Sequence, residues 1–164
     1  MEYKGQNVID ELRRHPLFRE YYKRLEEAER DRKFCRHQMD HLLDVARIAY
    51  IQNLEQKLGF SKEMIYAAAL LHDIGKVRQY EEKIPHEIAS AEIAEVILEE
   101  NGFCREEQES ILCAIKEHRR YREDMSGLGK LLYISDKKSR QCFACPAEAE
   151  CKWSLDKKNS EIEI

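Results

Sequence analysis

A run of five apolar residues, 67–71, ends directly in a histidine and an aspartate, His72 and Asp73. Because this run offers no polar face to solvent, it predicts a helix that is buried in a core. A charged pair at the end of a buried helix is costly unless a partner or a metal compensates it. We therefore expect His72 and Asp73 to lie in a closed cavity and to bind a divalent metal.

The two residues that follow fit the same interpretation. Gly75 allows the helix to stop. Lys76 then places a cation beside the metal, where an anionic substrate would need one. An electrostatic donor of this kind stabilises negative charge that develops in a transition state. Arg119 and Arg120 are further candidates for this substrate-binding role.

Four more side chains of the same chemistry occur in separate helix-like segments: His41, His86, His118 and Asp136. Imidazoles and carboxylates that meet at one point form a site for one or two divalent transition metals, such as Fe, Mn, Ni, Co or Zn. A metal lowers the pKa of bound water towards ~7, so that hydroxide is available at neutral pH. We assign Asp73 a catalytic role in orienting the attacking water.

The order H…HD…H…H…D resembles the HD-domain superfamily of metal-dependent phosphohydrolases. The resemblance implies an all-helical fold, hydrolysis of a phosphate ester or anhydride, and metal ligation by His41, His72, Asp73 and Asp136. His86 and His118 match the extra ligands of members that hold two metals. One subfamily with the same pattern hydrolyses dinucleoside tetraphosphates. The matching segments are HLLDVARIA (41–49), AALLHDIGKV (68–77), PHEIASAEIAEVIL (85–98), AIKEH (114–118) and LLYISDK (131–137).

Composition agrees with an all-α chain. The 164 residues include only six Gly and three Pro, the residues that favour tight turns. A many-stranded sheet needs many such turns, so this composition disfavours one. A formal net charge of −4 argues against a general nucleic-acid surface, which is normally basic. The N-terminus lacks the apolar centre of a signal peptide, and no stretch approaches the ~20 apolar residues of a membrane span. We expect a cytoplasmic protein with no membrane partner.

Periodicity and capping signals divide the chain into three parts. We expect an N-terminal helical extension over 1–33, the HD domain over 34–140, and a Cys-rich tail over 141–164 that folds back on the domain. The charged segment 17–33 is interpreted as a solvated helix face, and 76–85 as a polar loop. Helices are predicted over 6–13, from Pro16, and over 37–57, 62–74, 86–100, 105–118 and 127–140.

The tail carries a second metal signal. Residues 142–151 read CFACPAEAEC, so Cys142, Cys145 and Cys151 supply three thiolates. Cys35 precedes His41 by six residues, and Cys142 follows Asp136 by six. If His41 and Asp136 meet at one metal on antiparallel helices, both cysteines are displaced from that metal in the same direction along the helix axes. The displacement is about 9 Å, at 1.5 Å per residue. The arrangement resembles the 4Fe–4S staple of certain bacterial helicase–nucleases. Zinc and unliganded thiols are the alternatives, and Cys104 and Cys113 are expected to be small buried side chains.

The sequence therefore predicts a metal-dependent phosphohydrolase that acts on a nucleotide or a related small phosphate compound. One alternative is a nucleotide-binding regulatory module that keeps the metal without turnover. The other is a nucleic-acid-processing factor with a structural iron–sulfur cluster, against which the acidic net charge stands.

Overall fold

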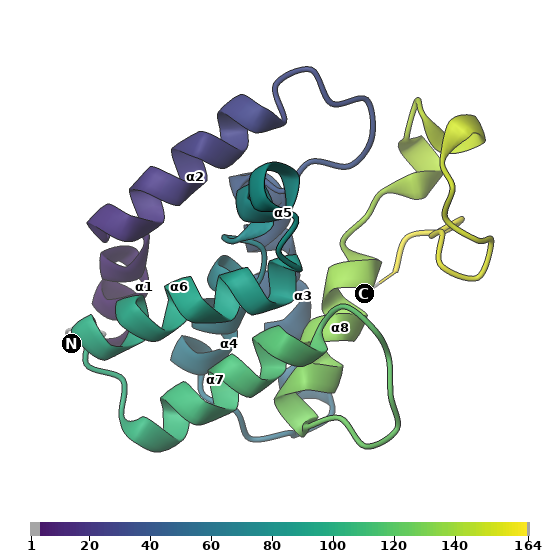
Figure 1. The fold of residues 1–164 in the computed structure, drawn as a ribbon. Coiled ribbons are helices and arrows are strands. Elements are labelled where there is room, and N and C mark those ends of the chain that lie inside the picture. Colours follow the sequence, from purple (N-terminus) through teal and green to yellow (C-terminus); the bar gives the residue numbers. More distant parts are fainter. Residues whose placement is uncertain (1–3, 164) are drawn as a thin grey trace.

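The computed structural model describes residues 4–163 and is all-helical, with no strand in that range, which confirms the predicted fold class (Figure 1). Eight α-helices are joined by short loops, and two 3₁₀ helices follow in the tail. The α-helices are α1 (Lys4–Arg14), α2 (Pro16–Ala28), α3 (Met39–Glu55), α4 (Lys62–Leu71), α5 (Lys76–Glu82), α6 (His86–Glu100), α7 (Arg105–Glu117) and α8 (Gly127–Lys138). The 3₁₀ helices are η1 (Cys142–Ala144) and η2 (Glu148–Glu150).

Helix α4 lies at the centre of the core. Its apolar run is buried as predicted, and it packs against α1, α3, α6, α7 and α8. Ser61 caps its N-terminus, because the Ser61 Oγ accepts a hydrogen bond of 3.2 Å from the Met64 amide. The helix ends at Leu71, so His72 and Asp73 lie in the turn that leads to α5. Both side chains are buried there.

Gly75 is required for close packing. A Cβ atom at Gly75 would lie 2.3 Å from the Ser90 backbone nitrogen and 2.6 Å from the Ala89 carbonyl carbon. The Gly75 amide also donates a 2.9 Å hydrogen bond to the Ser90 Oγ. The sequence interpretation assigned Gly75 to helix termination, but its φ of −87° suits any residue. The missing side chain allows the HD turn to approach α6.

Two elements differ from the sequence expectations. Residues 76–82, expected to form a polar loop, form helix α5, because the buried Val77 anchors this short segment. The segment 17–33 is not solvated on every face, since Phe18, Leu25 and Glu29 are buried. Phe18 belongs to the same hydrophobic core as α4, so α2 packs on the body of the molecule.

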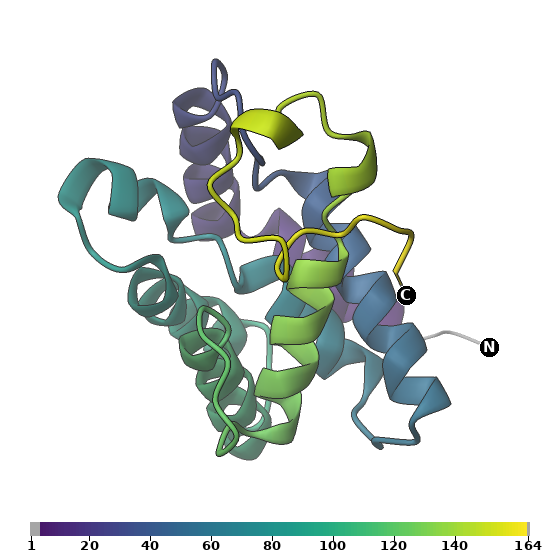
Figure 2. The ribbon, with the colours of Figure 1, turned by 90° about the vertical axis from the view of Figure 1, so that its right-hand side faces the viewer.

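The tail follows α8 and lies beside the loop that joins α2 to α3 (Figures 1 and 2). Among residues 141–163, Ala147 is the only buried side chain. The amide of Asn159 ties the tail to the end of α8 through hydrogen bonds of 2.7 Å to the carbonyls of Lys137 and Arg140. Within residues 4–163, no helix is both long and apolar enough to cross a membrane.

Candidate metal centre

One group of ligand atoms gathers from α3, α8 and the turn after α4. The Nε2 of His41 lies 3.2 Å from the Asp136 Oδ1 and 3.6 Å from the Asp73 Oδ2. The Nε2 of His72 lies 3.0 Å from the same oxygen of Asp73. Four ligand atoms, one from each residue, thus lie within 4.8 Å of one another, and all four residues are buried. This set has the composition and spacing of a divalent-metal site.

A second group uses the other oxygen of Asp73. The Nε2 atoms of His86, at the start of α6, and His118, at the end of α7, lie 3.5 Å and 3.6 Å from the Asp73 Oδ1. Asp73 therefore belongs to both groups, with one carboxylate oxygen directed to each. The structure brings together all six side chains that the sequence singled out as ligands.

Hydrogen bonds orient the histidines of the second group. The His118 Nδ1 donates to the Ile115 carbonyl at 2.6 Å, and the His86 Nδ1 donates to the Gln79 Oε1 at 2.7 Å. In the neutral rings, each Nε2 must then carry a lone pair. These two Nε2 atoms face each other at 3.1 Å. Two lone pairs that face each other at this distance need a cation between or beside them.

The first group is oriented in the same way. The His72 Nδ1 donates to the Ala69 carbonyl at 2.6 Å. The Ser139 hydroxyl donates to the Asp136 carbonyl at 2.6 Å and accepts from the His41 Nδ1 at 3.1 Å. The Nε2 atoms of His41 and His72 are buried without a hydrogen-bond partner. Buried lone pairs held by hydrogen bonds at the opposite ring nitrogen are typical of metal-ligating histidines, so the residues present fit a bound metal.

The electrostatics of the groups also favour a cation. Burial raises the pKa of Asp73, but the imidazoles around it, His72 first, hold that pKa well below its usual range. Burial would lower the pKa of His72, yet the carboxylates of Asp73 and Asp136 raise it to about 10. Burial lowers the pKa of His86 to about 2, despite the opposing charge of Asp73. Two ionised carboxylates thus lie in a buried space that accommodates positive charge.

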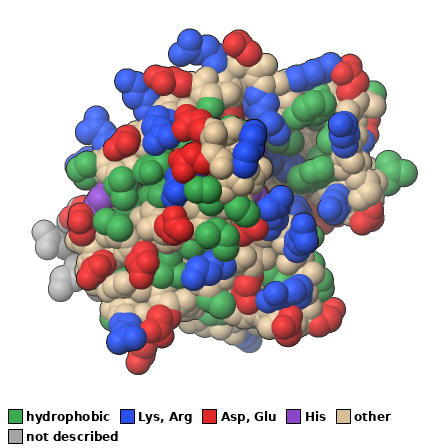
Figure 3. Space-filling view, viewed as in Figure 1, with side chains coloured by type: hydrophobic (Ala, Val, Ile, Leu, Met, Phe, Trp, Pro, Cys, Tyr) green, Lys and Arg blue, Asp and Glu red, His purple; other side chains and the backbone are tan. Residues whose placement is uncertain are grey.

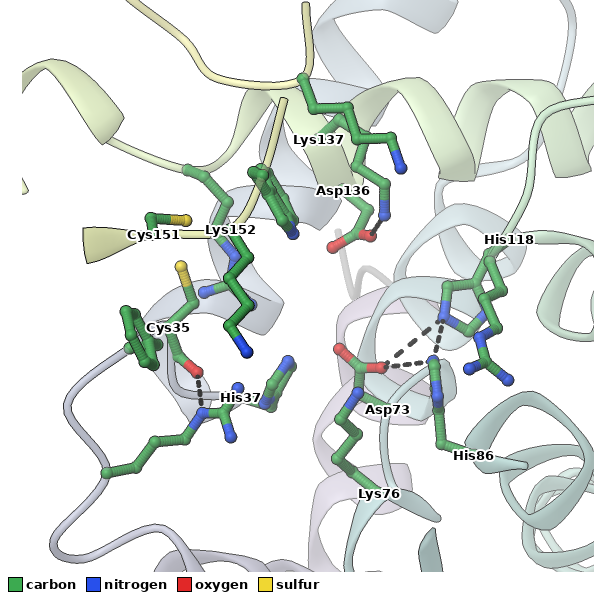
Figure 4. Close-up of a pocket in the computed structure, with 16 residues that line it drawn as sticks. Cys35, His37, Asp73, Lys76, His86, His118, Asp136, Lys137, Cys151 and Lys152 are labelled. Carbon is green, nitrogen blue, oxygen red and sulfur yellow. Dashed lines mark hydrogen bonds and ion pairs between the residues drawn. The ribbon is translucent and has the colours of Figure 1, made fainter. Parts of the chain in front are cut away.

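Both groups reach a cavity of about 400 Å³ through Asp73, Asp136, His86 and His118, which line it (Figure 4). His41 and His72 are buried and are not among its lining residues. Lys and Arg side chains surround the hollow between the helical body and the tail (Figure 3). Lys76 and Arg119 line the cavity, whereas Arg120 is exposed and is not among its lining residues. Seven cationic residues line it in all, namely Arg32, Lys76, Arg119, Lys137, Arg140, Lys152 and Lys157.

His37 is a further cavity residue that is not among the predicted ligands. His37 is buried, lines the cavity, and pairs through its Nδ1 with the Glu29 Oε1 at 2.5 Å. Glu29 is fully buried and also accepts a 2.8 Å hydrogen bond from the Tyr80 hydroxyl. The available signal was the position of His37 one helical turn before His41. The cavity residues of the tail, Lys152, Trp153 and Lys157, carry no sequence pattern.

The fold and the paired groups define an all-helical domain with a candidate metal site. A family model described as "HD domain" matches residues 39–141, and the chain belongs to this family. HD domains bind divalent metals, and the His and Asp side chains described above supply such a group here.

Similar proteins include a bacterial homologue of nearly the same length. An "Uncharacterized protein" of Clostridium beijerinckii is 49% identical over 142 residues, which cover 87% of this chain and 89% of that protein. "Ribonuclease Y" of Mesoplasma florum is 30% identical over 90 residues, which cover 55% of this chain but 18% of that protein. A crystal structure of a "predicted HD superfamily hydrolase" from an uncultured Thermotogales bacterium has a TM-score of 0.62, with 24% identity and coverage of 87% of this chain and 82% of that chain. This last likeness supports the fold.

Proposed function

We propose that the chain is a metal-dependent phosphohydrolase that cleaves a phosphate ester or anhydride of a nucleotide or a related compound. The observation that carries the proposal is Asp73, which directs one oxygen to each of two His-containing groups at the wall of a cation-lined cavity. A carboxylate shared between two ligand sets suits a site for two metals. A divalent metal bound there would supply hydroxide from water at neutral pH.

Individual residues are assigned to metal binding, charge stabilisation and substrate orientation. The groups around Asp73 and Asp136 would hold the metals, and His86 and His118 would complete the second set. Lys76 lies in the first turn of α5 and directs an ammonium into the cavity, where it stabilises negative charge on the phosphoryl oxygens. The buried pair of His37 and Glu29 presents an imidazole at the cavity wall and orients the substrate.

The cavity walls favour a substrate with a polyphosphate and a base. The seven cations exceed the two carboxylates among the lining residues, so a multiply charged phosphate chain is complementary to the cavity. Phe34 and Trp153 add aromatic rings to the same wall. Aromatic side chains next to cations are the usual platform for a nucleobase.

A hydrolysis screen tests the proposal. Purified protein would be supplied with Mn, Fe, Co or Ni and with nucleoside mono-, di- and triphosphates and a dinucleoside tetraphosphate. We expect release of phosphate or a nucleotide with at least one metal, and its suppression by a chelator. A metal-loaded protein that binds nucleotides but releases no product from any of them would favour the regulatory-module alternative.

The second ligand set makes a separate prediction. Replacement of His86 or His118 by Ala is expected to lower metal content from two ions towards one per chain without emptying the site, because the group at His41, His72 and Asp136 remains. Elemental analysis after dialysis against excess Mn measures this change. Wild-type protein that holds a single ion under the same conditions would contradict the two-metal proposal.

Lys76 makes a third prediction. Lys76→Ala is expected to leave metal content unchanged and to lower turnover by about 10²-fold, the typical cost of losing one donor to developing charge. Lys116→Ala, which alters an exposed lysine of α7, is the control. Steady-state kinetics on the best substrate of the screen measure both. Equal turnover for Lys76→Ala and wild type would remove Lys76 from the site.

RNA is a second candidate substrate, because the relative from Mesoplasma florum is named a ribonuclease. The cationic rim of the cavity is compatible with an RNA end. Hydrolysis of short oligonucleotides, compared with mononucleotides at matched concentration, separates the two. A clear preference for the oligonucleotide, with binding that weakens as salt rises, would favour RNA processing.

A further inference from the structure

Four cysteines from two distant parts of the chain line one cavity of about 280 Å³. Cys35 comes from the loop between α2 and α3, and Cys142, Cys145 and Cys151 come from the tail. All four are free and partly buried. Burial raises the pKa of the Cys35 thiol, and the three tail thiols lie close enough to raise it further. The two segments thus bring four soft ligands together.

The tail has too little apolar burial to fix its own position. Ala147 is its one buried side chain between residues 141 and 163, while Leu155 is 86% exposed. Polar contacts connect it to the α2–α3 loop. Lys33 pairs with Glu150, and the Arg140 guanidinium donates to the Arg36 carbonyl at 2.8 Å. Exposed pairs of this kind contribute little stability, and segments without a core commonly depend on a metal or another cross-link.

The spacing of the sulfurs distinguishes two kinds of centre. Within residues 4–163, no three of these sulfurs lie within 4.8 Å of one another. A single zinc ion, with Zn–S bonds of about 2.3 Å, needs sulfurs roughly 3.8 Å apart. A 4Fe–4S cluster is held by four cysteine thiolates around a larger body. The wider spacing favours the cluster.

We propose that Cys35, Cys142, Cys145 and Cys151 bind a 4Fe–4S cluster that fixes the tail against the α2–α3 loop and so builds one wall of the His/Asp cavity. Cys35 and Cys151 line both cavities, and Figure 4 places them across from Asp73, His86 and His118. Lys152 and Trp153 follow Cys151 directly and line the His/Asp cavity. Binding of the cluster is therefore coupled to the placement of these two side chains.

The presence of the cluster is tested without reference to activity. Protein purified without oxygen is expected to be brown and to contain about four acid-labile sulfides per chain, a species that metals at the His/Asp groups do not supply. Cys142→Ser should lose the sulfide, and Cys113→Ser, which alters an exposed cysteine, should keep it. Sulfide-free wild-type protein, with or without stoichiometric zinc, would overturn the proposal, as would a Cys142→Ser variant with full sulfide.

The proposed effect of the cluster on substrate binding at the cavity wall rests on the proposed function. It is measured in a separate experiment. Cys142→Ser is expected to raise KM for the nucleotide roughly tenfold, in the range that stacking on one aromatic ring supports, with a smaller change in kcat. Trp153→Ala should raise KM similarly while it keeps the sulfide. Retained Mn binding at the His/Asp groups shows that Cys142→Ser is folded. An unchanged KM in a sulfide-free variant would overturn the wall role alone, whereas inactivity of sulfide-containing wild type would overturn only the proposed function.

Discussion

Asp73→Asn is expected to remove both metals and to abolish hydrolysis, while the helical fold remains. Asp73 is the one residue common to both ligand groups, and Asn keeps its size but loses the negative charge. The loss of turnover should exceed the roughly 100-fold effect of losing a residue that only orients a ligand. Elemental analysis, steady-state kinetics and far-ultraviolet circular dichroism measure the three parts of this expectation.

Two variants serve as controls for Asp73. Asp124→Asn alters a carboxylate whose side chain is 80% exposed and should change nothing. Asp136→Asn removes a member of the first group only and should spare the metal at His86 and His118. If Asp73→Asn retained two ions, the shared-carboxylate arrangement would be wrong.

Gly75→Ala is expected to have the largest effect on stability. Its Cβ would overlap backbone atoms of α6 that cannot rotate away, so the HD turn and α6 must separate. Overpacking of this kind costs about 3 kcal/mol, which corresponds to a decrease in Tm of roughly 6–12 °C for a chain of this size. Because α6 carries His86, metal content should decrease as well. Thermal unfolding and elemental analysis measure both effects.

Ser90→Ala separates the steric effect from the lost hydrogen bond. This variant removes the acceptor of the Gly75 amide without adding an atom, so it measures the cost of the unpaired buried donor alone, about 1–3 kcal/mol. A Gly75→Ala protein with wild-type Tm and metal content would show that the contact with α6 does not constrain the site.

The gathering of the candidate ligands was predictable because several of them carry a local signal. His72 and Asp73 end a fully apolar run, and His41 lies beside a helical apolar stripe, so their burial follows from periodicity. Charged side chains at buried positions then point to a compensating cation. The all-α class followed in the same way from the helical segments and the scarcity of turn residues.

Other features depend on contacts between distant segments and could not be predicted. Helix α5 has one buried side chain, Val77, whereas its sequence is largely polar. Cys104 and Cys113, expected to be buried, are exposed, and Cys104 instead precedes α7 at its N-cap. Trp153 lines the cavity because of the course that the tail takes. The hydrophobic periodicity of the sequence does not predict that course.

Anomalous X-ray scattering from crystals of Mn-loaded protein tests the central claim most directly. We expect two Mn peaks per chain on opposite sides of the Asp73 carboxylate, one among His41, His72 and Asp136 and the other beside His86 and His118. A single peak with Mn in excess, or two peaks that do not share Asp73, would contradict the claim.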